Sequence, residues 1–265
     1  MKAIGIIPAR MGSSRFPGKP LATIGGVPMV GHVYLRSRLS PRLDAVYIAT
    51  CDDEIRRYAL EIGAECIMTS PLHERASDRT AEAACLIERR VGAIDVVVMI
   101  QGDEPMIHPD MIDEAMAPLG DPSVQVVNLM GPLDEDEARN PNAIKVVCDR
   151  NGDALYFSRQ PIPSGAGRGA HLLKQVCIIP FRRAFLTTFA ALEPTPLERI
   201  ESIDMLRAIE HGYRVRMVRT AHATRSVDTP GDLVAVSVLM AADGRAADPL
   251  PGHDGARNQT IQRDP

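Results

Sequence analysis

The sequence predicts an α/β fold with a mostly parallel central sheet flanked by helices. Two observations predict it: short β-rich runs alternate with helical patterns along the first half of the chain, and a loop rich in Gly, Ser and Pro follows the first run. Strands that alternate with helices at this spacing pair in parallel through right-handed crossovers. The composition, with 45% hydrophobic and 24% charged residues, supplies enough apolar surface for a full core.

The first half of the chain contains four expected strands. Asp52 or Asp53 is expected to cap one helix of this half, and Ser77 or Asp78 another. The run at 95–101 is the most apolar, which favours a central position in the sheet. The expected strands lie at 2–8, 45–50, 65–68 and 95–101, and the helices at 28–39, 53–62 and 78–91.

Beyond Pro109 the pattern is mixed, which predicts a smaller α+β subdomain at 110–210. We expect one domain over 1–243, whose core is made of 1–109 and 211–243. Residues 244–265 lack an apolar period and are expected to form a disordered tail, and the Gly-rich stretch 164–169 a flexible loop. Strands are expected at 124–130, 143–148, 154–158, 175–181 and 215–219, and helices at 183–192, 197–211 and 230–242.

Charge and composition exclude several classes of protein. A formal net charge of −4 and 4% aromatic residues without Trp argue against a nucleic-acid binder. The five cysteines stand singly without C-x-x-C spacing, which predicts reduced thiols. The apolar run at the amino end is short for a signal peptide, and no run reaches the ~20 residues of a membrane span. We expect a cytoplasmic protein without a membrane or nucleic-acid partner.

The loop at 8–20 predicts a site for a nucleoside triphosphate. It combines three cationic side chains, Arg10, Arg15 and Lys19, with two serines and two glycines. It follows a strand at the carboxyl edge of the sheet, where open α/β sheets bind ligands. Arg forks two phosphate oxygens, Lys acts as a point charge, and backbone N–H groups of Gly and Ser approach phosphates closely. It is not a Walker A loop, since no Ser or Thr follows Lys19; the alternative is a solvated basic surface loop.

Two aspartates are candidate ligands for Mg²⁺. Asp103 follows the strand at 95–101 and Asp228 precedes the last helix, so both are expected at the carboxyl edge of the sheet. Carboxylates there suit Mg²⁺, which takes one or two of them together with substrate phosphates and water. For Asp228 alone, a position near a helix N-cap is an equally good interpretation.

Seven motifs in a fixed order resemble the 3-deoxy-manno-octulosonate (Kdo) cytidylyltransferase family. The resemblance covers about residues 3–240 and implies a Rossmann-like nucleotidyltransferase fold. The motifs are Ile6-Ile-Pro-Ala-Arg10, Ser14-Arg-Phe-Pro-Gly-Lys-Pro20, Gln101-Gly-Asp-Glu-Pro105, Asn140-Pro-Asn-Ala-Ile-Lys145, Ala154-Leu-Tyr-Phe-Ser-Arg159, Pro196-Leu-Glu198 with Ile200 and Glu201, and Val227-Asp-Thr-Pro230.

The resemblance implies a reaction and the residues that perform it. An acceptor oxygen would attack the α-phosphate of CTP in line, CMP would be transferred and pyrophosphate released, with two Mg²⁺ ions held by Asp103 and Asp228. It also implies a homodimer through 110–210. The expected catalytic residues are Arg10, Lys19, Asp103 and Asp228. The expected nucleotide-binding residues are Ala9, Arg10, Gly12, Ser13, Arg15, Lys19, Arg79 and Gln101.

The acceptor half departs from the family pattern. Arg75 and Ala76 stand where members carry Ser and Gly, and Asp204-Met205 stand where they carry Glu-Gln. The acceptor is therefore a Kdo-type acid sugar, as in lipopolysaccharide biosynthesis, or another acidic sugar or small phosphonate, for which Arg75 adds a suitable charge. The expected acceptor-binding residues are Arg75, Gln101, Arg159, Gln175, Glu198 and Asp204.

A regulatory nucleotide-binding module is the remaining alternative to an enzyme. Such a module would need neither the paired carboxylates nor an acceptor pocket, so the sequence favours catalysis. His73, His171 and His222 show no metal-ligand spacing and are interpreted as solvent-facing loop residues.

Overall fold

The computed structural model describes residues 1–13, 15–133, 135–164 and 172–242. The expected tail at 244–265 and the Gly-rich loop from residue 165 onward lie outside the described residues. None of the helices in the described ranges is long and apolar enough to cross a membrane.

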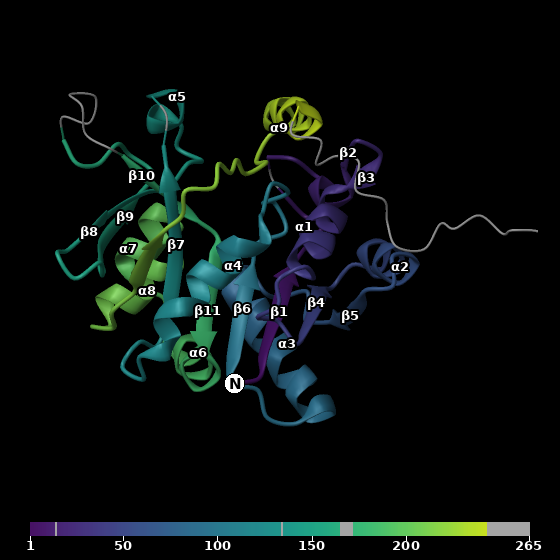
Figure 1. The fold of residues 1–265 in the computed structure, drawn as a ribbon, viewed down its shortest axis with the longest axis horizontal. Coiled ribbons are helices and arrows are strands. Elements are labelled where there is room, and N and C mark those ends of the chain that lie inside the picture. Colours follow the sequence, from purple (N-terminus) through teal and green to yellow (C-terminus); the bar gives the residue numbers. More distant parts are fainter. Residues whose placement is uncertain (14, 134, 165–171, 243–265) are drawn as a thin grey trace, which may run out of the picture.

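The central sheet has the strand order β11-β6-β1-β4-β5 (Figure 1). β1 pairs in parallel with β4 and β6, β4 pairs in parallel with β5, and β11 is antiparallel to β6. The predicted fold class, a mostly parallel sheet, is therefore confirmed. The strands are β1 (Ala3–Pro8), β4 (Ala45–Thr50), β5 (Glu65–Met68), β6 (Val96–Ile100) and β11 (Ile178–Arg182).

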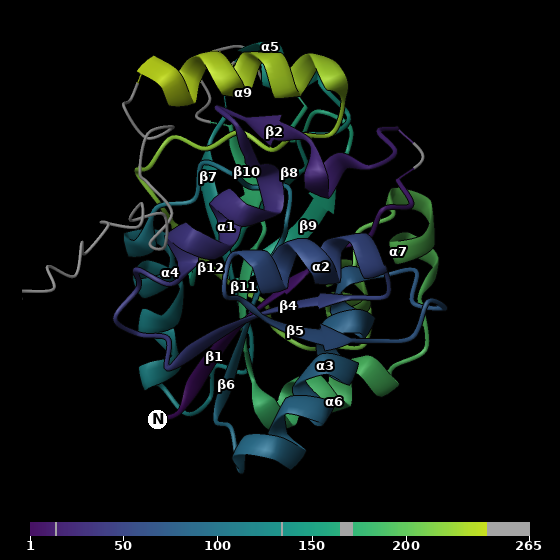
Figure 2. The ribbon, with the colours of Figure 1, turned by 90° about the vertical axis from the view of Figure 1, so that its right-hand side faces the viewer.

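Helices cover both faces of this sheet (Figure 2). Alternate side chains of β6 enter two separate apolar cores, as a pleated strand requires: Val97 and Met99 pack with α3 and α6, whereas Val98 and Ile100 pack with α1, α2 and α4. The helices are α1 (Met29–Ser37), α2 (Asp53–Glu61), α3 (Ala76–Val91), α4 (Pro109–Met116) and α6 (Arg183–Ala191).

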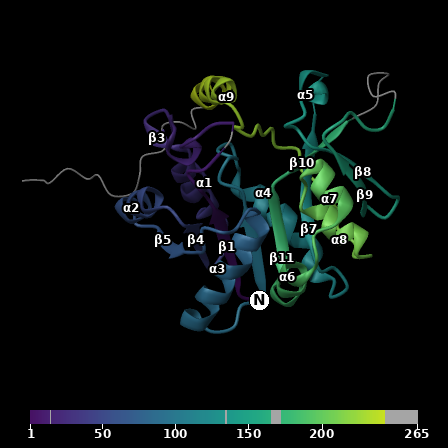
Figure 3. The same ribbon diagram turned by 180° about the vertical axis from the view of Figure 1, so that it is seen from behind.

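A second, mixed sheet has the order β12-β7-β10-β8-β9. β7 pairs in parallel with β12, and the other pairs are antiparallel. The two sheets meet through a bridge between Val126 and Phe181 (Figure 3). The strands are β7 (Val127–Pro132), β8 (Lys145–Cys148), β9 (Ala154–Ser158), β10 (Leu173–Val176) and β12 (Arg216–Arg219), with α7 (Pro196–Glu201) and α8 (Met205–Glu210) beside them.

The last helix, α9 (Pro230–Ala242), lies across the carboxyl end of the central strands (Figures 1 and 2). Its Val236 and Met240 pack with Ile24 of the small hairpin formed by β2 (Thr23–Ile24) and β3 (Val27–Pro28). This packing fixes the start of α9, where Asp228 lies. The shorter elements are α5 (Glu135–Arg139) and the 3-10 helices Lys19–Leu21 and Ala117–Gly120.

Two single elements expected from the sequence are each divided in the structure. The strand expected at 175–181 is β10 and β11, which lie in different sheets and separate at Cys177. Apolar residues stand on both sides of Cys177, and no Gly, Asn or Asp there signals the change of sheet. The helix expected at 197–211 is α7 and α8, which separate at Ser202 with a left-handed backbone (φ 56°).

The expected boundary at 110–210 does not follow the two sheets. α4, β11 and α6 belong to the layers of the central sheet although they fall within this range, and β12 joins the second sheet although it lies outside it. The reason is that strands of the second sheet pair with partners far away in the chain: β7 pairs with both β10 and β12. The single domain over 1–243 stays a prediction.

Two side chains that were expected to cap helices, those of Asp52 and Ser77, form hydrogen bonds with other segments instead. Asp52 occupies the N-cap position of α2, but its carboxylate accepts a hydrogen bond from the Met11 backbone N–H (2.8 Å) and not from the helix. Ser77 lies inside α3, which begins after Arg75, and its hydroxyl donates to Asp204 (2.6 Å). Both side chains therefore connect a helix to a distant segment.

A buried ion pair joins α7 to α8. Arg207 donates to both carboxylate oxygens of Glu198, from Nε (2.8 Å) and Nη2 (2.6 Å). The side chains are only 1% and 3% exposed, and the Arg207 guanidinium also lies 5.0 Å from the centre of the Phe189 ring. Removing either partner would leave an uncompensated polar group in the core.

We predict that Glu198→Gln lowers the free energy of unfolding by about 3 kcal/mol, because it removes the buried two-point partner of Arg207 and leaves only the longer contact with Asp78 (3.4 Å). Equilibrium urea unfolding followed by circular dichroism measures the loss. Glu61→Gln, on an exposed position of α2, is the matched control and should change stability by less than about 0.5 kcal/mol. Equal stability of the two variants would contradict a structural role for this pair.

Candidate active site

The basic loop is anchored on the end of the neighbouring strand. The Ala9 backbone N–H donates to the Ala49 carbonyl oxygen (2.9 Å), and the Asp52 carboxylate accepts from Met11. The chain then turns back at Gly18, whose N–H donates to the Met11 carbonyl (3.0 Å) and whose backbone has φ 75°. A side chain is rarely tolerated at that angle, so Gly is needed to close the loop.

The turn after β6 packs against the end of β1. A Cβ atom at Gly102 would lie 3.3 Å from the Pro8 carbonyl oxygen, so only Gly permits this approach without a shift. The Gln101 backbone N–H donates to the Cys177 carbonyl (3.0 Å), which also holds the turn against the junction of β10 and β11. Gln101 and Asp103 are thereby placed beside the basic loop.

A first cavity of about 240 Å³ lies between this loop, the turn after β6 and the amino end of α3. The sequence-predicted nucleotide residues all line it, although Arg79 reaches it from α3 and Gln101 from β6. Arg79 is held in place by a hydrogen bond from Nη1 to the Thr69 hydroxyl (2.5 Å). The nucleotide-binding candidates in its wall are Ala9, Arg10, Gly12, Ser13, Arg15, Lys19, Arg79 and Gln101.

The two predicted metal ligands meet at Lys19. The Lys19 ammonium lies 2.8 Å from an Asp103 carboxylate oxygen and 3.5 Å from an Asp228 carboxylate oxygen. Arg15 also approaches Asp228, at 2.9 Å. The backbone supports this arrangement, because the Val227 N–H donates to the Asp103 carbonyl (2.9 Å). Asp103 and Asp228, far apart in the sequence, therefore lie at one place.

The charged groups of Lys19, Asp103 and Asp228 are largely buried, so water screens them poorly. Burial, and next the nearby negative charge of Asp103, raise the pKa of Asp228 above its usual value, although Lys19 and Arg15 oppose the shift. Burial works against the ammonium of Lys19, but the carboxylates of Asp103 and Asp228 outweigh it and raise the pKa of Lys19. Lys19 therefore stays charged, and the carboxylate pair favours additional positive charge.

A second cavity of about 150 Å³ adjoins the first, and Arg15, Gln101 and Asp103 line both. It lies where the two sheets meet, beside the junction of β10 and β11 at Cys177. The acceptor-binding candidates in its wall are Gln101, Arg159, Gln175 and Asp204.

The structure does not bring Arg75 and Glu198 to the second cavity. Arg75 lines the first cavity, where it donates to the Ser202 hydroxyl (2.8 Å) and lies 3.7 Å from Asp204. Glu198 lines neither cavity, because its carboxylate is buried against Arg207. The sequence identified the motif that contains Glu198, but not Arg207, the residue that pairs with its carboxylate.

The acceptor candidates are fixed by neighbouring groups. Arg159 donates from Nε to the Glu201 carbonyl (2.6 Å) and from Nη1 to the Pro141 carbonyl (2.9 Å). The Gln175 amide donates to the Asn128 side chain (2.5 Å). Burial raises the pKa of Asp204, which accepts from Ser77. These side chains present a rigid wall to the second cavity.

Sequence reasoning missed a second polar cluster in this cavity. Thr224 donates to a Glu104 carboxylate oxygen (2.8 Å), and the Lys174 ammonium donates to the Thr224 carbonyl (2.8 Å) and pairs with Glu137. Burial, and next the charge of Asp103, raise the pKa of Glu104 to about 7. Glu104 could have been found, since it adjoins Asp103 in one motif. Lys174 belongs to none of the seven motifs, so nothing in the sequence indicated that it would lie in this cavity.

Comparison with known proteins shows the family to which the chain belongs. The family model described as "Cytidylyltransferase" matches residues 4–218. The 3-deoxy-manno-octulosonate cytidylyltransferase of Geobacter metallireducens is 43% identical over 247 residues, covering 88% of this chain and 95% of the relative. The protein of the same name from an Anaeromyxobacter species is 45% identical over 242 residues, covering 91% and 97%.

A solved structure agrees with these relatives. A CMP:2-keto-3-deoxy-manno-octonic acid synthetase complexed with CTP superposes with a TM-score of 0.82 at 39% identity, covering 92% of this chain and 100% of the other. A cytidylyltransferase from Leptospira borgpetersenii, at 17% identity and a TM-score of 0.57, shares the fold. The extent and identity of these matches show that the chain is a nucleotidyltransferase and belongs to the 3-deoxy-manno-octulosonate cytidylyltransferase family.

Proposed function

We propose that this enzyme transfers CMP from CTP to Kdo, depends on Mg²⁺ and releases pyrophosphate. One observation carries the proposal: Lys19, Asp103 and Asp228 meet where the cavity lined by nucleotide candidates adjoins the cavity lined by acceptor candidates. A phosphate at that boundary lies within reach of the basic loop on one side and of an acceptor on the other. In-line attack needs this arrangement of nucleophile, phosphorus and leaving group.

The basic loop offsets the charge of the triphosphate. Arg10, Arg15 and Lys19 all line the first cavity. At about 4 Å and an effective dielectric near 20, each cation–phosphate pair contributes on the order of 4 kcal/mol before desolvation is counted. Gly12 lines the same cavity, and because it has no side chain a phosphate can approach the backbone closely there. The loop therefore orients the α-phosphate and stabilises the charge that leaves with pyrophosphate.

Asp103 and Asp228 are the residues that would hold Mg²⁺. The donor chemistry fits, because both groups are carboxylates and lie around one cationic point. The pKa of Asp228 is raised by burial and next by the charge of Asp103, and a bound cation would oppose both effects. Mg²⁺ bound there supplies charge neutralisation on the phosphates and orientation of the acceptor oxygen. Lys19 holds the two carboxylates together and stays protonated.

Kdo is favoured as the acceptor because the relatives of similar length carry that name. Arg159 supplies positive charge for its carboxylate in the second cavity, and Gln101 and Gln175 supply amides for its hydroxyls. Kdo transfer therefore agrees with the family and with these three side chains.

One observation favours a second candidate, transfer of CMP to another acidic sugar or a small phosphonate. Five large apolar side chains interrupt the mostly polar wall of the second cavity and offer no hydrogen bonds to a polyol. Each missing bond removes roughly 0.5–1.5 kcal/mol. These apolar residues are Met99, Ile144, Ile179, Ile203 and Met205. The homodimer and the cytoplasmic location expected from the sequence stay predictions.

We predict that Lys19→Met, Asp103→Asn and Asp228→Asn each lower kcat/KM for CMP transfer by at least about 100-fold, because each removes a charge that acts on the reacting phosphate. Pyrophosphate release measured over a range of CTP concentrations gives kcat/KM. Asp53→Asn, on an exposed position of α2, is the matched control and should retain activity. Full activity in either Asp103→Asn or Asp228→Asn would refute the proposed site.

We predict that pyrophosphate release requires CTP, Mg²⁺ and Kdo together. A panel of four nucleoside triphosphates crossed with Kdo, other acidic sugars and small phosphonates tests the substrates, and chelation with EDTA followed by added Mg²⁺ tests the metal. Chelation should reduce the rate to background and Mg²⁺ should restore it. Turnover of a phosphonate without turnover of Kdo would overturn the acceptor but keep the cytidylyl transfer. An undiminished rate in EDTA would overturn the metal.

A further inference from the structure

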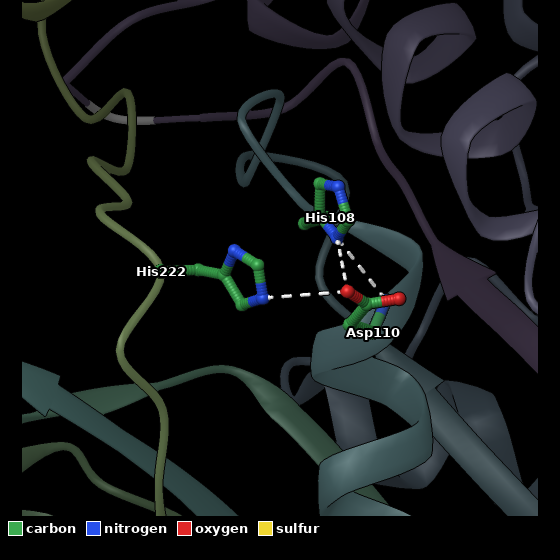
Figure 4. Close-up of side chains that lie close together, drawn as sticks. All are labelled: His108, Asp110 and His222. Atoms are coloured by element: carbon green, nitrogen blue, oxygen red, sulfur yellow. Dashed lines mark hydrogen bonds and ion pairs between the residues drawn. The ribbon is translucent and has the colours of Figure 1, made fainter.

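Two histidines and an aspartate converge outside the cavities described above (Figure 4). His108 is the N-cap residue of α4 and Asp110 lies in the first turn of that helix, whereas His222 lies on the segment between β12 and α9. His108 Nδ1 is 3.4 Å, and His222 Nε2 is 3.7 Å, from the same Asp110 carboxylate oxygen. The ligand atoms of all three side chains lie within 4.8 Å of one another.

This geometry is close to that of a tetrahedral metal site. Ligand atoms about 2.0 Å from a zinc ion and at tetrahedral angles lie about 3.3 Å from one another. The separation between His108 Nδ1 and Asp110 is close to that value, and His222 Nε2 lies slightly farther from the same oxygen, at 3.7 Å. The two imidazole rings are stacked with centroids 4.4 Å apart and planes 11° from parallel, and each presents a nitrogen to the Asp110 carboxylate (Figure 4).

From the sequence we interpreted His222 as a solvent-facing loop residue without metal spacing. It does lie on a loop and is partly exposed, but it also lies beside His108 and Asp110. Its partners stand more than a hundred residues earlier in the chain, so no spacing rule could find them. Within the described part of the chain, this is the one group of three or more His, Cys, Asp or Glu side chains with such proximity. All three side chains are partly exposed, at 34%, 64% and 27%, so an ion can enter from solvent.

We propose that His108, Asp110 and His222 form a binding site for a divalent transition-metal ion of the Zn²⁺ class, separate from the Mg²⁺ proposed at Asp103 and Asp228. Two imidazoles and a carboxylate suit Zn²⁺, and water completes the tetrahedron. Mg²⁺ prefers oxygen ligands and octahedral geometry, so it does not compete well here. Binding replaces the long hydrogen bond (3.3 Å) that His108 Nδ1 accepts from the Asp110 N–H.

The site would brace the two chain segments that carry the catalytic carboxylates. His108 follows Asp103 by five residues, and His222 precedes Asp228 by six. Between these points the segments are already joined, by the hydrogen bond from Val227 to Asp103. An ion held by His108 and His222 adds a second, stronger connection at the outer end. A bound ion would therefore restrict the motion of the segment before α9. It would not take part in the chemical step.

The test is Zn²⁺ binding to the full chain, at slightly alkaline pH with millimolar Mg²⁺ present to occupy oxygen sites. Competition with a chromophoric zinc chelator measures affinity and stoichiometry, and a thermal-unfolding scan measures the accompanying rise in Tm. His222→Gln removes one ligand from a loop. His108→Asn removes another but keeps a good N-cap residue for α4, so the helix is preserved. His211→Gln is the matched control, since His211 lies apart from the cluster and contacts the Glu193 carbonyl.

The wild-type chain and His211→Gln should each bind one Zn²⁺ ion at this site and gain Tm. The His222→Gln and His108→Asn variants should bind it at least tenfold more weakly, since even loss of a partner behind a ligand costs about 10- to 100-fold in affinity. No Zn²⁺ binding by the wild-type chain, or equal affinity in His222→Gln and His211→Gln, would overturn the site. Because the readout is binding and not catalysis, its failure leaves the proposed transfer reaction untouched.

Discussion

The contact between Lys19 and the carboxylates of Asp103 and Asp228 is the interaction on which the site depends. Each partner comes from a different segment: the loop after β1, the turn after β6, and the stretch before α9. Burial, and next the charge of Asp103, raise the pKa of Asp228 and so destabilise its charged form. One ammonium relieves this in the free protein, and the same imbalance makes the point attractive to a divalent cation.

The position of that contact follows from how the two sheets meet. Cys177 separates β10 in the second sheet from β11 in the central one, and its carbonyl accepts the N–H of Gln101. The turn that presents Asp103 is thus fixed from both sheets at once. The two cavities open on either side of it and share Arg15, Gln101 and Asp103. A reaction between two small molecules needs such a shared wall, because both must reach one phosphorus atom.

Several charged residues near the acceptor cavity stabilise the fold and leave others to recognise the acceptor. Glu198 is occupied by Arg207, and Arg75 lies near Asp204 and donates to Ser202. Arg159 keeps the position that its hydrogen bonds to Glu201 and Pro141 impose. The wall of the second cavity is mostly polar, with apolar side chains such as Ile179 and Met205 between the polar groups.

The sequence by itself determined the mostly parallel sheet and the basic loop at 8–20, because these follow from local periodicity and from one contiguous motif. Arg79 and Gln101, which line the first cavity together with that loop, were predicted through the resemblance. The sequence also identified Asp103 and Asp228 as partners, through a resemblance in motif order. Only the tertiary structure decided that 175–181 divides between two sheets, that Glu198 is buried against Arg207, and that His222 lies beside His108. Each of these depends on residues distant in the chain, which meet only when the two sheets and their helices have packed.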